Sequence, residues 1–92
     1  MSVAMQSIQH VWRRIERHAG EAFRQKSGGE FRYEIHGNGL VPDRTNRRIS
    51  RGDFEKALQL VPFESTTVLQ HLQGPSYIYA VLMDARIRLD DW

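Results

Sequence analysis

Four arginines lie within eight residues of the chain, directly before a predicted helix. With one asparagine they form the run Arg44, Asn46, Arg47, Arg48 and Arg51. A guanidinium is a planar donor that binds two oxygens of a phosphate or carboxylate at once, and the backbone N–H groups at a helix N-terminus also attract phosphate. These residues are therefore the first candidate nucleic-acid-binding site. The alternative is a solvated loop held by the nearby carboxylates of Asp53 or Glu55.

A second basic group lies on one face of a helix predicted over residues 5–19. The helical period places four side chains together on that face: His10, Arg13, Arg14 and Arg17. Arg24 is a further candidate member of this group. We expect Arg13 and Arg17 to join the candidate nucleic-acid site if the fold brings them beside the arginine run. The alternative is the ordinary charged outer face of an amphipathic helix.

Positive charge is concentrated in the first part of the chain. The net charge is +2, but residues 1–52 carry a balance of +5 and residues 53–92 a balance of −3. Arginine outnumbers lysine eleven to two, which fits recognition of phosphate or carboxylate groups. This asymmetry predicts either a basic face that meets a polyanion, or oppositely charged ends that attract a second copy or an acidic protein partner.

Residues suited to catalysis or metal binding are scattered. The four histidines form neither an HxxxH nor an HExxH pair, and the chain has no cysteine, so the sequence predicts no metal site. It contains no GxSxG motif for a serine nucleophile. Its two glycine-rich pieces fit hairpin turns rather than phosphate-cradling loops. We therefore expect no enzymatic activity and no cofactor.

The elements that position the arginines begin with the helix over residues 5–19. Its apolar side chains recur at helical spacing on the inner face: Ile8, Val11, Trp12, Ile15 and Ala19. Ser7 is the expected N-cap. Gly20 is the expected stop, because glycine tolerates the positive φ found just beyond a helix.

A small antiparallel meander is predicted next. Residues 31–36 alternate apolar and polar side chains, which is typical of a half-buried strand. A Gly-Gly turn before them allows residues 21–26 to pair as the preceding strand, and the turn Gly37-Asn38-Gly39 allows a return strand through Leu40 and Val41. Pro42 is expected to end that strand. Residues 43–49 are predicted as a loop or an edge strand.

Helices are predicted in the rest of the chain. Ser50 is the expected N-cap of a helix over residues 51–61 that Pro62 stops. A short helix starts at Ser65 or Thr66, with the apolar residues Val68, Leu69 and Leu72 directed inward. Residues 77–83 are apolar all round, so periodicity does not separate helix from strand. Pro75 favours a helix over residues 75–85, and residues 86–92 are predicted as a short strand or a packed extension.

The predicted fold is a single α+β domain over residues 1–92. It has an N-terminal amphipathic helix, a meander of two or three strands, and two or three C-terminal helices. This order is compatible with a winged-helix-like arrangement, a comparison at the level of fold alone. No apolar run is long enough to cross a bilayer, and no signal-peptide pattern begins the chain, so a cytoplasmic location is expected.

Two binding functions remain open at this stage. The first is nucleic-acid binding through Arg44, Arg47, Arg48 and Arg51, supported by Arg13 and Arg17. The second is a self-associating or protein-interaction module built on the apolar segment from Tyr77 to Met83. In that alternative, the candidate interface residues are Tyr77, Tyr79 and Met83.

Overall fold

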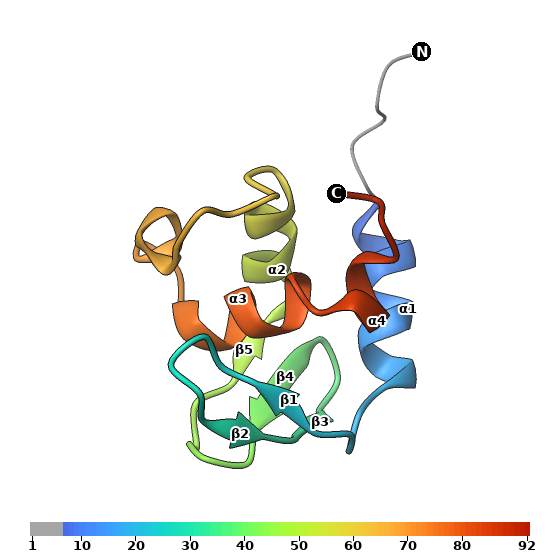
Figure 1. Ribbon diagram of the computed structural model, residues 1–92. Helices are drawn as coiled ribbons and strands as arrows, with labels where there is room; N and C mark the ends of the chain where they lie inside the picture. The colour runs from blue at the N-terminus through green and yellow to red at the C-terminus, as the bar shows by residue number, and fades with distance from the viewer. Residues whose placement is uncertain (1–6) are drawn as a thin grey trace.

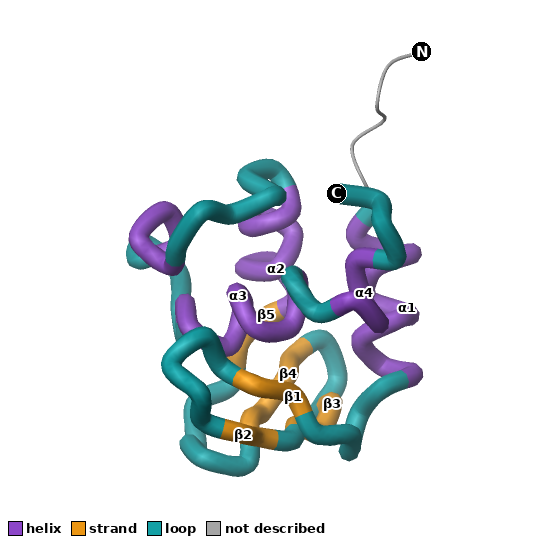
Figure 2. Tube along the Cα trace, viewed as in Figure 1, coloured by secondary structure: helices purple, strands orange, loops and turns teal. Residues whose placement is uncertain are grey.

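The structure is a computed structural model that describes residues 7–92 of the chain. Its elements are α1 (Ile8–Arg17), β1 (Phe23–Arg24), β2 (Glu30–Phe31), β3 (Tyr33–Ile35), β4 (Gly39–Pro42), β5 (Ile49–Ser50), α2 (Arg51–Leu58), the 3₁₀-helix η1 (Thr66–Leu69), α3 (Pro75–Leu82) and α4 (Ala85–Arg88). The strands lie at one end of the molecule below α3, and α1 packs beside α4 at its side (Figures 1 and 2). This arrangement confirms the predicted α+β class.

Helix α1 has the expected N-cap, but it ends at Arg17, two residues before its predicted end. The Oγ atom of Ser7 accepts a hydrogen bond from the backbone N–H of Gln9 at 3.2 Å. Gly20 follows the helix with a φ of +88°, a conformation that costs glycine little. Ala19 was predicted to face inward but is exposed, because the helix ends at Arg17 and Ala19 lies in the turn beyond it. Residues 5 and 6 of the predicted helix lie outside the described residues.

The strands form two small antiparallel sheets. β1 pairs with β2, and β3, β4 and β5 form a second sheet in that order. The predicted alternation is confirmed, since Phe31 and Tyr33 are buried while Arg32 and Glu34 are exposed.

Pro42 belongs to β4, whereas the sequence predicted that this residue would end the strand before it. His36 and Gly39 exchange both backbone hydrogen bonds, at 2.8 and 3.1 Å, and the N–H of Asp43 donates to the carbonyl of Arg32 at 2.8 Å. Bonded and non-bonded pairs alternate along an antiparallel ladder. The pair of Tyr33 and Pro42 therefore falls at a non-bonded position, where the missing N–H of proline costs no ladder bond.

Two helical predictions require correction in the segment after β5. α2 starts at its predicted cap, where Ser50 Oγ accepts from the N–H of Asp53 at 3.1 Å, but it ends at Leu58 rather than at residue 61. The residue before a proline avoids helical geometry, and the chain leaves the helix before Val61. Val68 was expected to face inward and is 45% exposed. η1 has a 3₁₀ repeat of three residues per turn. Leu69, and Leu72 three residues further along the chain, are therefore buried on one face, while Val68 faces away.

The apolar segment after Pro75 is a helix, as predicted, and it ends at Leu82 instead of residue 85. α3 lies at the centre of the core and buries four side chains: Ile78, Ala80, Val81 and Leu82. Phe31 meets Tyr77 edge-on with 4.9 Å between ring centroids. The tail is a packed extension, because α4 buries Ile87 against this core.

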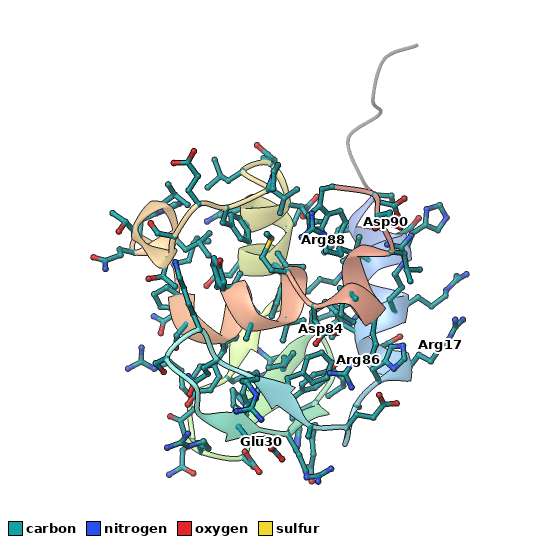
Figure 3. The ribbon with its side chains drawn as sticks, in the orientation of Figure 1. Arg17, Glu30, Asp84, Arg86, Arg88 and Asp90 are labelled. Atoms are coloured by element: carbon teal, nitrogen blue, oxygen red, sulfur yellow. The ribbon has the colours of Figure 1, made fainter. Side chains whose placement is uncertain are left out.

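A hydrogen-bonded arginine fastens the C-terminal segment to β1. The guanidinium of Arg86 lies over the ring of Phe23, 3.9 Å from its centroid. It donates to Asp84 and Glu21 at 2.9 Å and to the carbonyl of Ala22 at 2.7 Å (Figure 3). The hydrogen bond to Asp84 raises the pKa of Arg86 further above neutrality. The cluster is therefore fully charged at physiological pH.

The two carboxylates of this cluster have lowered pKa values. For Glu21 the largest cause is its hydrogen bond with His18, followed by burial, which acts in the opposite direction. Burial alone would raise the pKa of Asp84, but the hydrogen bonds from Arg86 outweigh it and lower that pKa. Both carboxylates favour the folded state in their ionised form.

We predict that Asp84→Asn lowers the free energy of unfolding by about 1 kcal/mol at pH 7. Asparagine keeps a side-chain oxygen for the helix cap, while the charge and the second acceptor for Arg86 are lost. Because the folded pKa of Asp84 is lowered, the charge stabilises the fold above the ordinary value of 3.8, and this contribution disappears as the pH falls through the folded pKa. Urea unfolding from pH 7 to pH 2 tests this. A difference that stays constant over the range contradicts it, and Glu55→Gln, on the exposed face of α2, is the control.

Candidate nucleic-acid interface

The arginine run does not converge on a single point. The Nη1 atom of Arg44 lies 3.5 Å from Oε1 of Gln25, beside the turn between β1 and β2. Arg48 instead covers the turn between β3 and β4, where its Nε and Nη2 atoms donate to the carbonyl of His36 at 3.4 and 3.2 Å. The two side chains therefore rest on two different hairpin turns. Arg47 lies between Arg44 and Arg48 in the sequence, and its side chain is exposed.

Arg51 and Arg13 do come together. The backbone N–H of Arg51 donates to the carbonyl of Asn38 at 2.7 Å, so the first residue of α2 is joined to the β3–β4 turn. Its side chain also lines a groove between α1 and α2 with a volume of about 190 Å³. The α1 residues of this groove are Gln9, Trp12, Arg13 and Glu16. Their spacing of three and four residues places them on one face of the helix.

We call Arg13, Arg51 and Arg48 together the basic strip. The backbone N–H of Arg51 and the side chain of Arg48 both donate to carbonyls of the β3–β4 turn. Arg51 and Arg13 line the same α1–α2 groove. Arg17 extends from α1 one turn beyond Arg13 and points away from the body of the molecule (Figure 3). Of the predicted arginines, Arg13 and Arg51 line one groove, Arg48 lies on the neighbouring β3–β4 turn, and Arg44 lies beside the β1–β2 turn.

The basic strip is not neutralised by carboxylates of the described residues. The ion pairs within residues 7–92 involve other side chains: Arg14 with Asp91, Arg86 with Asp84 and Glu21, His18 with Glu21, and His36 with Glu34. Asp53, which was a candidate partner of the arginine run, accepts the backbone N–H of Gln73 at 3.2 Å instead. The proposed neutralisation of the run by Asp53 is therefore not observed.

Arg14 has a different role from its neighbours on α1. The sequence placed it on the outer basic face, but its side chain is only 19% exposed. It donates to Asp91 at 2.6 Å and to the carbonyl of Ile87 at 2.8 Å. Arg14 therefore fastens the C-terminal segment to α1, and its charge is already compensated.

Trp12 carries an unpaired donor at the α1–α2 groove. Its side chain is 2% exposed and packs against Phe54, with 5.6 Å between ring centroids. The indole Nε1 has no hydrogen-bond partner among residues 7–92. A buried donor without a partner costs about 1–3 kcal/mol. Trp12 was predicted only as a core residue, and Gln9 and Glu16 were not among the predicted site residues, although their spacing in the sequence places all three on one face of the helix.

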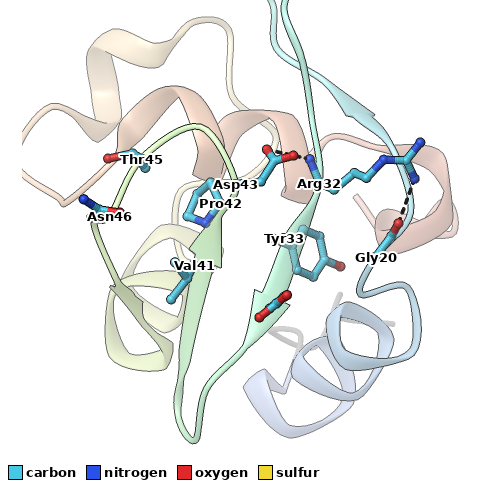
Figure 4. A pocket seen from close by; sticks show the side chains of 9 residues that line it. Gly20, Arg32, Tyr33, Val41, Pro42, Asp43, Thr45 and Asn46 are labelled. Carbon is cyan, nitrogen blue, oxygen red and sulfur yellow. Dashed lines mark hydrogen bonds between the residues drawn. The ribbon is translucent and has the colours of Figure 1, made fainter.

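Asn46 lines a different groove, on the outer face of the β3–β4 hairpin (Figure 4). This groove has a volume of about 430 Å³. On its other side Arg32 donates to the carbonyl of Gly20 at 2.8 Å, and Asp43 accepts the N–H of Arg32 at 3.1 Å. Its lining carries the carboxylates of Glu34 and Asp43 beside the single guanidinium of Arg32, so it has no net positive charge and does not extend the basic strip.

The candidate interface residues of α3 are half-buried. Tyr77 packs on Phe31, and Tyr79 packs on Phe63 with 5.9 Å between ring centroids. Met83 lines a shallow groove beside Tyr79. The chain covers most of α3 itself, and self-association through these residues stays a prediction.

Residues 7–92 contain neither a candidate metal site nor a helix able to span a membrane. That range contains no group of three histidine, cysteine or acidic side chains placed to hold a metal ion. None of its helices combines the length and the apolar character needed to cross a bilayer.

Arg48 and Gly39 are expected to be energetically coupled, because a Cβ atom at Gly39 would collide with the Arg48 side chain. We predict that Gly39→Ala lowers the free energy of unfolding by about 1–2 kcal/mol, and that most of this loss vanishes in the presence of Arg48→Ala. A double-mutant cycle measured by urea unfolding gives the coupling energy, expected at about 1 kcal/mol. Additive effects of the two changes would show that Arg48 does not rest on this turn.

Comparison with known proteins identifies no relative of this chain. Neither protein-family models, nor curated proteins, nor solved structures give a match to the chain. The interpretation of the basic strip and its groove therefore depends on their residues alone.

Proposed function

We propose that this domain binds nucleic acid through the basic strip, with guanidinium groups contacting backbone phosphates. One observation carries the proposal: Arg13 and Arg51 line one groove, Arg48 lies on the β3–β4 turn to which the backbone of Arg51 is bonded, and none of the three has a carboxylate partner among residues 7–92. Unpaired arginines of this kind attract a polyanion. The exposed Arg47 adds charge beside the strip.

The position of the strip at the start of α2 supports the same function. Arg51 is the first residue of that helix, where the partial positive charge of the helix end disfavours a cation. A phosphate would relieve this repulsion further than Asp53 does, which lies in the first turn of the same helix and accepts the backbone N–H of Gln73.

A protein-interaction role remains the alternative, and its surface features are weaker. The exposed large apolar side chains, Leu60, Val68 and Leu89, belong to three separate segments. We favour nucleic acid because two arginines without ion-pair partners share one groove, whereas the apolar exposure is divided.

The proposal predicts a steep salt dependence of binding. For a duplex DNA probe, the logarithm of affinity should fall with the logarithm of salt concentration by about 0.9 for each phosphate contacted. We expect Arg13→Gln combined with Arg51→Gln to reduce this slope by about two units on a duplex, whose paired bases leave both guanidinium groups to the phosphates. Fluorescence anisotropy of a labelled duplex between 20 and about 200 mM salt measures it.

The matched control is Arg24→Gln combined with Lys26→Gln. It removes the same charge from the β1 region, outside the strip, and should leave the slope within about half a unit of the wild type. Equal effects of the two double variants would mean that only net charge matters. Absence of binding at low salt by both duplex and single-stranded probes would exclude the proposed function.

A further inference from the structure

The α1–α2 groove offers more than positive charge. Arg13 and Arg51 present hydrogen-bond donors, and Glu16 presents two carboxylate acceptors in the same groove. Glu16 forms no ion pair with either arginine among the described residues. A groove that served phosphate alone would gain nothing from this carboxylate, which repels an anion. The combination fits a ligand that carries both acceptors and donors.

Among the common bases, guanine matches this combination best. Its O6 and N7 atoms accept a bidentate pair of bonds from an arginine. Its Watson–Crick edge also presents two adjacent N–H donors, which match the two oxygens of a carboxylate. We propose that the α1–α2 groove binds one unpaired guanine of a single-stranded nucleic acid, with Glu16 as the residue that selects the base. This inference rests on the proposed function and names the ligand of the same surface.

The size of the groove favours a single base over a larger ligand. Its volume of about 190 Å³ is below the range of about 300–1,000 Å³ that is usual for pockets of drug-sized molecules. A base in a duplex keeps its Watson–Crick edge paired, so Glu16 could reach it only in a single strand. The groove also contains Trp12, whose buried indole N–H lacks an acceptor among residues 7–92.

The test uses fluorescein-labelled oligomers of twelve nucleotides, all thymidine except one central position. The central nucleotide is deoxyguanosine, deoxyadenosine or deoxyinosine, and inosine lacks the exocyclic N–H donor of guanine. We expect the guanine oligomer to bind about tenfold more tightly than the adenine oligomer, with inosine between them. Annealing the guanine oligomer to its complement should abolish the advantage.

Glu16→Gln isolates the base-selecting step. An amide has one acceptor in place of two and adds a donor, so the guanine preference should fall to within about twofold. Affinity for the all-thymidine oligomer should not decrease, because the variant loses a negative charge. Glu55→Gln on α2 removes the same charge outside the groove and should keep the guanine preference. Circular dichroism confirms that both variants are folded.

The outcomes separate this inference from the proposed function. Salt-dependent binding with equal affinity for guanine and adenine oligomers would overturn the guanine site and leave nucleic-acid binding intact. A guanine preference that survives Glu16→Gln would overturn the role of Glu16. Guanosine monophosphate, added as a competitor, shows whether the free nucleotide occupies the same groove. In a Trp92→Phe background, the emission of Trp12 should change on guanine binding, and an unchanged emission would place the base elsewhere.

Discussion

The burial of α3 on nearly all sides constrains every other element of this domain. Ile78, Val81 and Leu82 are fully buried, and a chain of 92 residues has few apolar side chains with which to cover such a helix. Aromatic residues of the small sheets cover one side, as the contact of Phe31 with Tyr77 shows, and α2, η1 and α4 cover the others. Because the apolar residues are used inside, the surface is left to charged side chains.

Some of those charged side chains complete the covering of α3. Arg86 lies over Phe23 and reaches Glu21, so it joins α4 to the segment around β1. Arg14 performs a similar task between α1 and the C-terminal residues, through Asp91. These guanidinium groups are bound by carboxylates and backbone carbonyls of their own chain. They are not available to a partner, and the high arginine content therefore overstates the free positive charge.

The sequence predicted what depends on local physics. The caps at Ser7 and Ser50, the alternation around Tyr33 and the helix after Pro75 all follow from neighbouring residues. The end of α2 and the exposure of Val68 depend on how the chain leaves one helix and winds the next, which apolar spacing does not encode. The arginine run could be found from composition, but not its division between two hairpin turns, since Arg44 and Arg48 find their contacts in residues distant in sequence. Glu16 was not predicted as a site residue, because a cluster of arginines predicts an anion site and gives no role to the carboxylate that lies within it.

Arg13 and Arg14 show how narrowly the candidate site is determined. They are adjacent in sequence, but neighbouring residues of a helix are rotated by about 100° around its axis. Arg14 therefore points to Asp91, while Arg13 lines the groove beside Arg51. In the proposed function, the exposed arginines supply affinity that any nucleic acid can use, because phosphate contacts carry no sequence information. Selectivity must come from a group that a phosphate does not satisfy. Within the α1–α2 groove that group is Glu16. Its carboxylate repels a phosphate that enters without a base, and it attracts the N–H donors of guanine. Both effects favour guanine over a phosphate alone.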